Sequence, residues 1–348
     1  MIKTNGSDRM WNKNRKGGRS IHKKGNQLSW RKSKCFSVFT SVIALPGSIL
    51  NNAQGPELRT YLVGQIARAA AVFCVEEIVV YDEMARMKPQ ERENYYNRQW
   101  QPNFSMRNDN VECNFHMARI LEFMECPQYL RKTLFPLQKA LRFAGILNPL
   151  DCPHHLRASD LSIPYREGVV LDKPAKAGCG PLCDIGLYKE VQINEEVTLE
   201  PGTRVTVKVS NMYSERKRYR GCLVTSQQIK EEAGIYWGYH VRIASSLSDA
   251  LNSEKYDVII GTSERGKPAS QFEMPVSDKN RVLLVFGGLE GLEAAMKADD
   301  SIKFSNPEEL FEYYLNVVPG QGSRTIRTEE AIPIALAALR SAIYGECV

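Results

Sequence analysis

The hydrophobic pattern between residues 35 and 81 predicts a β-α-β unit. Cys35–Leu45 is rich in β-branched and aromatic residues, as expected of a buried strand, and Pro46-Gly47 should end it. Because Pro56 suits the first position of a helix, we expect a helix to begin there. Apolar residues then recur at helical spacing: Leu58, Leu62, Ile66, Ala69 and Phe73. Glu76–Tyr81 is the second strand, and this order favours a parallel sheet.

The pattern between residues 84 and 165 is less regular. Met84–Asn114 is polar and aromatic without clear periodicity, which predicts an excursion from the sheet. Helical spacing resumes in Phe115–Met124. Cys152, His154 and His155 in the turn-rich segment Asn148–His155 invite a metal interpretation that Cys179 and Cys183 could join, but neither spacing matches a common zinc pattern. We therefore interpret them as ordinary polar loop residues and predict no metal site.

Short apolar runs separated by turn residues predict a small β-barrel between residues 166 and 247. The five candidate strands are Glu167–Leu171, Lys189–Ile193, Arg204–Val209, Gly221–Thr225 and Tyr239–Ala244. A five-stranded barrel of this size is typical of the OB type, which commonly holds single-stranded nucleic acid. Basic and aromatic side chains interleave here, as in Tyr213–Arg220, and suit phosphate binding and base stacking. We favour RNA contact over the alternative of ordinary exposed charges.

After residue 247 the chain returns to the α/β pattern. Tyr256–Ile260 and Arg281–Phe286 are predicted strands, and Pro307–Asn316 is a predicted helix. The composition of Ala331–Tyr344 favours a last helix, for which Thr328 is a suitable N-cap.

Glycine-bearing turns accompany these elements in three places. They are IIGTSERG (Ile259–Gly266), LLVFGGLEGLE (Leu283–Glu293) and PGQGSRTIRTEEAI (Pro319–Ile332). Glycine lets a backbone approach a ligand closely or adopt a positive φ, and a turn before a helix offers free N–H groups. Each turn alone could be a solvated loop. Together they predict one site built by three loops.

The charge of the chain is unevenly distributed. The net charge is +6, but residues 1–35 contain eleven Lys and Arg against one acidic residue, so the remainder is slightly acidic. Met1–Lys34 has few apolar residues and is predicted to be a disordered basic arm. Such an arm could bind nucleic acid, serve as a nuclear localisation signal, or only increase solubility.

Composition argues against a membrane or secreted protein. No apolar run approaches the roughly 20 residues that a membrane helix needs. The basic N-terminus lacks the apolar core of a signal peptide. Nine cysteines, an odd number, fit reduced thiols better than a disulfide framework. The length of 348 residues suggests roughly two domains.

These motifs together resemble a known family. GTSERG, VFGGLEGLE and NVVPGQGSRTIRTEEA, with LPGSILNNAQGPELRTYLVGQIARA near the start, resemble the SPOUT class of RNA methyltransferases, in the branch with an OB-like insertion. The resemblance covers about Cys35 to Leu339 and implies an α/β fold: a parallel sheet with a C-terminal trefoil knot, interrupted by a small OB-like β-barrel. The expected domains are the arm 1–34, a first methyltransferase part 35–165, the insertion 166–247, and a second methyltransferase part 248–348.

The resemblance also implies a site for S-adenosyl-L-methionine in the knot loops. The residues that match these loops are Thr262, Arg265, Gly287, Gly288, Asn316, Gly320, Ser323 and Thr325, and Arg324 with Thr325 could instead support the loop. SPOUT enzymes are usually homodimers with the active site at the subunit interface. Arg59 resembles the arginine that the first helix contributes there.

The eukaryotic members of this branch methylate N3 of a uridine in large-subunit (28S) rRNA. N3 carries a proton, so the resemblance implies a base or a group that stabilises the deprotonated ring. Glu290 and Glu264 are candidate bases, although each could instead pair with Arg265 or Arg324. The family also implies a nuclear or nucleolar location and association with the spindle, centrosome or kinetochore.

Two other functions compete with this interpretation. A non-catalytic RNA-binding or mitotic spindle scaffold could retain the fold, but it would not need three glycine-bearing loops. A dinucleotide-dependent oxidoreductase is excluded, because VFGGLEGLE lacks the G-x-G-x-x-G order.

Overall fold

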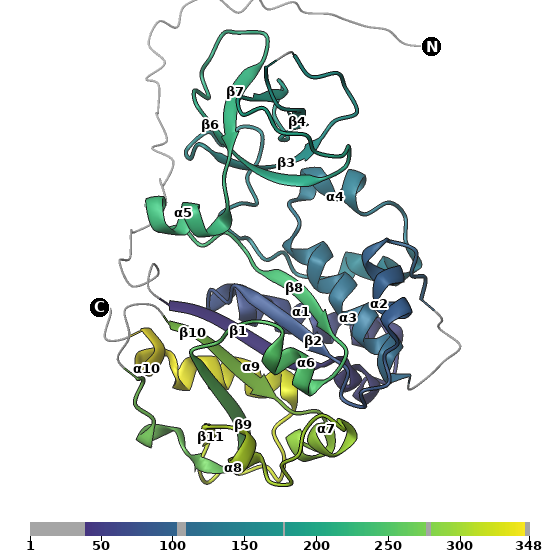
Figure 1. The fold of residues 1–348 in the computed structure, drawn as a ribbon, viewed down its shortest axis with the longest axis vertical. Helices are drawn as coiled ribbons and strands as arrows, with labels where there is room; N and C mark the ends of the chain where they lie inside the picture. Colours follow the sequence, from purple (N-terminus) through teal and green to yellow (C-terminus); the bar gives the residue numbers. More distant parts are fainter. Residues whose placement is uncertain (1–38, 103–108, 177, 276–279, 345–348) are drawn as a thin grey trace, which may run out of the picture. The chain divides into compact units, whose positions relative to one another are not determined.

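A six-stranded parallel sheet forms the centre of the structure (Figure 1). The computed structural model describes residues 39–102, 109–176, 178–275 and 280–344, so the predicted arm 1–34 lies outside the described residues. The sheet strands are β1 (Phe39–Pro46), β2 (Glu77–Tyr81), β8 (His240–Ala244), β9 (Val258–Pro268), β10 (Asn280–Phe286) and β11 (Tyr313–Asn316). Their order is β11-β9-β10-β1-β2-β8, and every pairing is parallel. The predicted β-α-β opening and parallel sheet are therefore confirmed.

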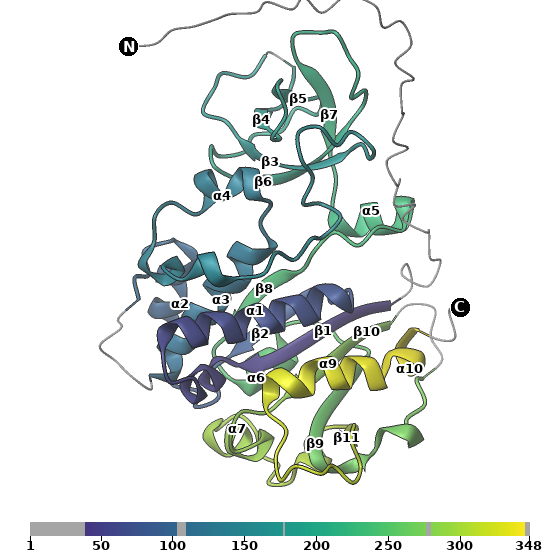
Figure 2. The same cartoon turned by 180° about the vertical axis from the view of Figure 1, so that it is seen from behind.

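Helices cover both faces of this sheet. The α-helices are α1 (Pro56–Val72), α2 (Pro89–Tyr96), α3 (Asn110–Glu125), α4 (Gln128–Leu134), α5 (Ser226–Ala233), α6 (Leu247–Asn252), α7 (Leu292–Ala298), α8 (Pro307–Leu310), α9 (Thr328–Ala338) and α10 (Arg340–Tyr344). Short 3-10 turns are η2 (Gly47–Asn52), η3 (Lys139–Leu141), η4 (Ala144–Ile146) and η5 (Ala269–Gln271). Figure 2 shows α1 and α9 side by side on one face, and α6 and α7 lie on the other.

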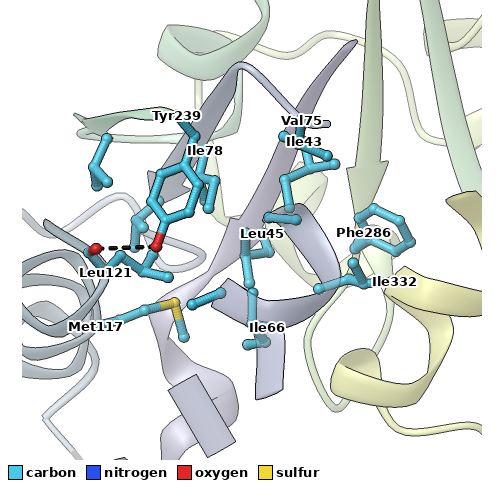
Figure 3. Packing of buried hydrophobic residues seen from close by; sticks show 14 of the residues in the cluster. Ile43, Leu45, Ile66, Val75, Ile78, Met117, Leu121, Tyr239, Phe286 and Ile332 are labelled. Carbon is cyan, nitrogen blue, oxygen red and sulfur yellow. Dashed lines mark hydrogen bonds between the residues drawn. The ribbon is translucent and has the colours of Figure 1, made fainter. Parts of the chain in front are cut away.

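Alternation along the strands divides the core into two clusters. Ile43 and Leu45 of β1 point toward α1, α3 and α9, where they pack with Ile66 and Ile332 (Figure 3). Val42 and other residues of opposite parity pack under α6 and α7. Because both faces are covered, the strands read as continuous apolar runs, as the sequence of β1 and β2 does.

A closed five-stranded barrel is inserted between the first and last parts of the sheet. Its strands are β3 (Tyr165–Val170), β4 (Leu182–Asp184), β5 (Val191–Ile193), β6 (Arg204–Val209) and β7 (Tyr219–Leu223), in the order β3-β4-β5-β7-β6. Its own buried cluster includes Val191, Ile193 and Val207. The predicted barrel is confirmed, whereas the domain boundaries drawn around it stay predictions.

The prediction of the fifth barrel strand was wrong. Tyr239–Ala244 does not enter the barrel: β8 pairs with β2, with His240 opposite Glu77. The side chain of Tyr239 is buried and donates a hydrogen bond from its hydroxyl to the Leu121 carbonyl oxygen, at 3.0 Å (Figure 3). The missing barrel strand is β4, which is only three residues long and carries no periodic signal.

The helix predicted over Pro307–Asn316 was also wrong. Helix α8 ends at Leu310, and β11 begins at Tyr313 and pairs with β9 at the edge of the sheet. Its aromatic run favours a strand over a helix. The last helical region also differs, because α9 begins at Thr328 and is separated from α10. Within the segment predicted as an excursion, α2 forms and α3 begins at Asn110.

No helix in the described part of the chain is both long enough and apolar enough to cross a bilayer.

Candidate active site

Loops at the carboxyl edge of the sheet bring the candidate residues together. Since all six strands are parallel, the segments after β1, β2, β10 and β11 leave from the same edge. Open α/β sheets bind their ligands at this edge. The sheet order places β10 between β9 and β1, so its loop adjoins loops from both sides.

The two glycines after β10 are required by close packing. A Cβ on Gly287 would lie 2.6 Å from the carbonyl carbon of Gly291, and one on Gly288 would lie 2.2 Å from Oε1 of Glu83. The Gly287 carbonyl oxygen accepts a hydrogen bond from Oγ1 of Thr328, at 2.9 Å. Thr328 therefore connects the first turn of α9 to the loop after β10, and it is not the N-cap predicted from the sequence.

Two predicted cofactor residues hold neighbouring loops in place. Thr262 donates a hydrogen bond from Oγ1 to the Val285 carbonyl oxygen, at 2.9 Å, and so connects β9 to β10. Asn316 donates from Nδ2 to the Glu264 carbonyl oxygen, at 2.8 Å. Its Oδ1 accepts from the backbone N–H of Val318, at 2.9 Å. The side chains of Thr262 and Asn316 thus hold neighbouring loop segments together.

The remaining predicted cofactor residues are more exposed. Arg265 forms an ion pair with Glu293, with 3.0 Å between Nη1 and Oε1. Gly320 has a φ of +76°, a conformation that favours glycine. Ser323 donates from Oγ to the Thr325 carbonyl oxygen, at 2.9 Å. The segment after β11 therefore has internal hydrogen bonds but open space around its glycine.

Arg59 lies on the first turn of α1 and is oriented by the turn after β1. Its Nη2 donates to Oδ1 of Asn51, at 3.3 Å, and Nδ2 of Asn51 donates to Oδ1 of Asn110, at 2.9 Å. The charge of Arg59 also acts on the imidazole of His116. Burial and then the Arg59 guanidinium lower the pKa of His116 to about 4. His116 is therefore neutral near pH 7.

Sequence reasoning missed Glu83. This carboxylate comes two residues after β2, its exposed fraction is 8%, and its Oε2 accepts a hydrogen bond from the Ser48 hydroxyl. Burial raises the pKa of Glu83 above its usual value, while the Ser48 hydroxyl and the Gly288 backbone N–H lower it and the negative charges of Glu290 and Asp82 raise it. The sequence feature that could have identified Glu83 is its position as an acidic residue just after a buried apolar strand.

Glu290 and Glu264, the two carboxylates that the sequence favoured as bases, are exposed, whereas Glu83 is buried. Glu290 is exposed, although its charge reaches Glu83. Glu264 is also exposed, and its Oε2 accepts from Nε2 of Gln321, at 3.3 Å. The partner of Arg265 is Glu293, so neither of the expected pairings with that arginine forms.

The histidines of the turn-rich segment have structural contacts. His154 is buried, and its Nε2 lies 2.9 Å from Oε1 of Glu125. Nε2 of His155 lies 2.7 Å from the Glu125 carbonyl oxygen. In the part of the chain that the structure describes, no three His, Cys, Asp or Glu side chains gather as a ligand set for a metal ion.

The chain belongs to an RNA methyltransferase family. The family model described as "Putative RNA methyltransferase" matches residues 40–339, which is most of the chain. A mouse (Mus musculus) protein named "28S rRNA (uridine-N(3))-methyltransferase" is 50% identical over 307 residues, covering 87% of this chain and 76% of the relative. The human (Homo sapiens) protein of the same name is 49% identical over 308 residues, covering 87% of this chain and 78% of the relative. The methyltransferase prediction is thereby confirmed at the level of the family.

Proposed function

We propose that this protein transfers a methyl group from S-adenosyl-L-methionine to N3 of a uridine in large-subunit (28S) rRNA. The observation that carries the proposal is the high identity to the mouse and human relatives over most of the chain. Membership of an RNA methyltransferase family supports the same reaction class. The glycine-bearing loops at one edge of the sheet supply a place for the donor.

The loops after β9, β10 and β11 suit a nucleoside cofactor. Gly287 and Gly288 bring backbone close to backbone, and Thr262 and Asn316 use their side chains to fix the loops. Backbone N–H and C=O groups can then bind adenine and ribose without a charged side chain. The cofactor supplies a methyl group on a positively charged sulfur. The trefoil knot implied by the resemblance is part of this proposal, supported by the position of β10 between β9 and β1.

The barrel offers a surface for the RNA. Tyr188 and Tyr213 have exposed fractions of 96% and 77%, and the loop between β6 and β7 carries exposed Arg216, Lys217 and Arg218. Exposed aromatic rings can stack on unpaired bases, and the cations can bind phosphate oxygens. This combination supports contact with a single-stranded or looped RNA segment.

A homodimer would bring α1 to an interface. Leu58, Tyr61 and Val72 on this helix are exposed apolar residues, and Arg59 lies among them. Helix α9 packs next to α1 and exposes Ala337 and Ala338. An apolar surface of this kind supports pairing with a second copy of the chain. Arg59 would then lie at or near the active site of one of the two copies.

An rRNA substrate is consistent with a nuclear or nucleolar location, which we also propose. Association with the spindle, centrosome or kinetochore rests on the resemblance alone. It would not require catalysis, and a scaffold without methyl transfer is the alternative function. Localisation of the tagged full-length chain through the cell cycle would test both locations.

The central experiment separates an enzyme from a scaffold. The full-length protein is titrated with S-adenosyl-L-methionine by calorimetry and then incubated with fragments of 28S rRNA. Mass spectrometry of the nucleosides should detect 3-methyluridine. Folded protein that neither binds the donor nor modifies any fragment would favour the scaffold.

A further inference from the structure

Glu83 occupies the boundary between the loop predicted for the cofactor and the turn that holds Arg59. Its Oε1 packs against Gly288 of the loop after β10. Its Oε2 accepts a hydrogen bond from Ser48 of η2, the same turn from which Asn51 contacts Arg59. One carboxylate therefore contacts segments that follow two different strands, β1 and β10.

Oε1 of Glu83 is buried and makes no hydrogen bond of good geometry among the described residues, although the backbone N–H of Gly288 lies close enough to lower the pKa of the carboxyl. A buried carboxylate oxygen without a partner is costly, and it is more often found at a functional site than in an ordinary core. The side chain cannot swing away freely, because Ser48 holds the other oxygen. The unsatisfied oxygen thus lies beside the loop where a ligand is expected.

We propose that Glu83 is the general base that accepts the N3 proton of the target uridine. This inference rests on the proposed function, since it assigns one step of that reaction to a residue. It replaces Glu290 and Glu264, which are exposed and less suited to a water-excluded proton transfer.

The other carboxylates at this edge are already engaged. Asp82 accepts hydrogen bonds from the backbone N–H groups of Met84, Arg86 and Met87, at 3.2, 2.6 and 2.8 Å. These bonds fix the segment after β2 and use both oxygens of Asp82. Its role is structural.

Two acids on neighbouring helices are also less suitable. Glu293 of α7 pairs with Arg265. Glu329 also has a buried oxygen without a partner, but its other oxygen lies 3.9 Å from the Arg327 guanidinium. It stands in the first turn of α9, where the helix dipole stabilises a carboxylate and weakens it as a base. Glu83 has neither a cationic partner nor a helix N-terminus.

The proposed step is balanced in atoms and charge. The ionised Glu83 carboxylate takes the proton from N3, and the electron pair of the N–H bond stays on N3. N3 forms a bond to the methyl carbon while the bond between that carbon and sulfur breaks, leaving its electron pair on sulfur. The products are 3-methyluridine, S-adenosylhomocysteine and protonated Glu83, which later releases its proton to water. Burial strengthens Glu83 as a base because it raises its pKa toward the working pH.

The polar and charged groups that shift the pKa of Glu83 come from three segments. Asp82 belongs to its own loop and Glu290 to the loop after β10, and both charges raise the pKa of Glu83. Ser48 of η2 contributes a neutral hydroxyl that lowers it. Asn51 of η2 accepts a hydrogen bond from Arg59, whose charge would stabilise the deprotonated uracil ring.

Glu83→Gln in the full-length protein tests the assignment. Glutamine keeps the shape and can still accept from Ser48, so the affinity for S-adenosyl-L-methionine and for an rRNA fragment should stay within about twofold. The single-turnover methylation rate should fall by about 10²–10⁴-fold. Glu309→Gln, an exposed carboxylate on α8, is the matched control and should methylate like the wild type.

A substrate with a more acidic N3–H distinguishes a general base from a residue that is only structural, because only the loss of a base should be partly offset by that acidity. 5-Fluorouridine at the target position has a more acidic N3–H, so Glu83→Gln should lose less activity on it than on uridine. Equal losses on both substrates, or an unchanged rate on uridine, would overturn the assignment. A loss in Glu290→Gln with full activity in Glu83→Gln would assign the base to Glu290 instead. A wild-type protein that binds no donor and methylates no uridine would overturn the proposed function, and this inference with it.

Discussion

The guanidinium of Arg204 in the barrel donates two hydrogen bonds to the carboxylate of Glu125, at the end of α3. Nη1 donates to Oε2 at 2.5 Å and Nη2 donates to Oε1 at 3.0 Å. Nε of the same arginine donates to Oε2 of Glu167, at 2.6 Å. Because Glu125 and Glu167 are both buried, one guanidinium compensates two buried negative charges.

Replacing this arginine should strongly destabilise the protein. Arg204→Ala would leave Glu125 and Glu167 without their cation, and loss of one partner of a buried ion pair costs about 3–5 kcal/mol. Urea unfolding followed by intrinsic fluorescence measures the change. Lys208→Ala, which breaks an exposed ion pair between β6 and Glu232 of α5, is the control and should have a much smaller effect. Similar losses in both variants would contradict the special role of Arg204.

The contribution of Glu125 to the free energy of unfolding should decrease as the pH falls. Although burial acts to raise its pKa, the Arg204 guanidinium and His154 hold the pKa of Glu125 well below its usual value. A lowered pKa in the folded state stabilises the protein above the pKa of the unfolded chain, near 4.3, and this stabilisation disappears as the pH falls toward the folded pKa. The free energy of unfolding of Glu125→Gln should therefore lie furthest below that of the wild type near pH 7. A difference that does not shrink between pH 5 and pH 3 would contradict this.

The sequence predicted elements better than it predicted their partners. Strand β1 and helix α1 follow from local apolar spacing, because both bury one continuous set of side chains. The position of β8 in the sheet does not follow from local spacing, because it depends on pairing with β2, a segment far away in the chain. Tyr313–Asn316 similarly became a strand because the edge of β9 was available to it.

The site shows the same division between local and long-range information. Glycines at 287 and 288 could be recognised from composition, and the structure explains both by close contacts. Glu83 could not, because its significance comes from Ser48 and Gly288, which approach it only in the folded chain. The ligand roles predicted for Arg59, Arg265 and the loop after β11 stay predictions.

Alanine substitutions should distinguish a glycine required by close packing, Gly288, from one required by a positive φ, Gly320. In Gly288→Ala the new Cβ would overlap Glu83, so we expect the dissociation constant for S-adenosyl-L-methionine to rise about tenfold, or about 1.4 kcal/mol. Gly320→Ala meets no neighbour but forces a positive φ on alanine, which should cost about 1–2 kcal/mol of stability. Gly145→Ala, with open space and no positive φ, is the control. Calorimetry and thermal unfolding measure the two effects, and unchanged donor affinity in Gly288→Ala would argue against this loop as the cofactor site.

Arg59→Ala should separate binding from chemistry. The side chain donates a hydrogen bond to Asn51 on η2, away from the loops predicted to bind the donor, so donor affinity should change little. Turnover should fall by about 10²-fold or more if the guanidinium stabilises negative charge on the target base. Mixing this variant with an inactive variant of another residue should restore activity if Arg59 acts across a dimer. Full turnover by Arg59→Ala alone would remove it from the site.

Glu83→Gln should be at least as stable as the wild type near neutral pH. Burial raises the pKa of Glu83 in the folded state, so the ionised form opposes folding. The pH dependence of stability due to Glu83 is opposite to that due to Glu125. The wild type loses stability as the pH rises from the unfolded-state pKa of Glu83 toward its folded-state pKa, whereas the uncharged variant does not. The melting temperature of Glu83→Gln relative to the wild type should therefore increase from pH 4 to pH 7. A lower melting temperature at pH 7 would mean that the carboxylate stabilises the loops, as expected of a structural residue but not of a buried base held ready for proton transfer.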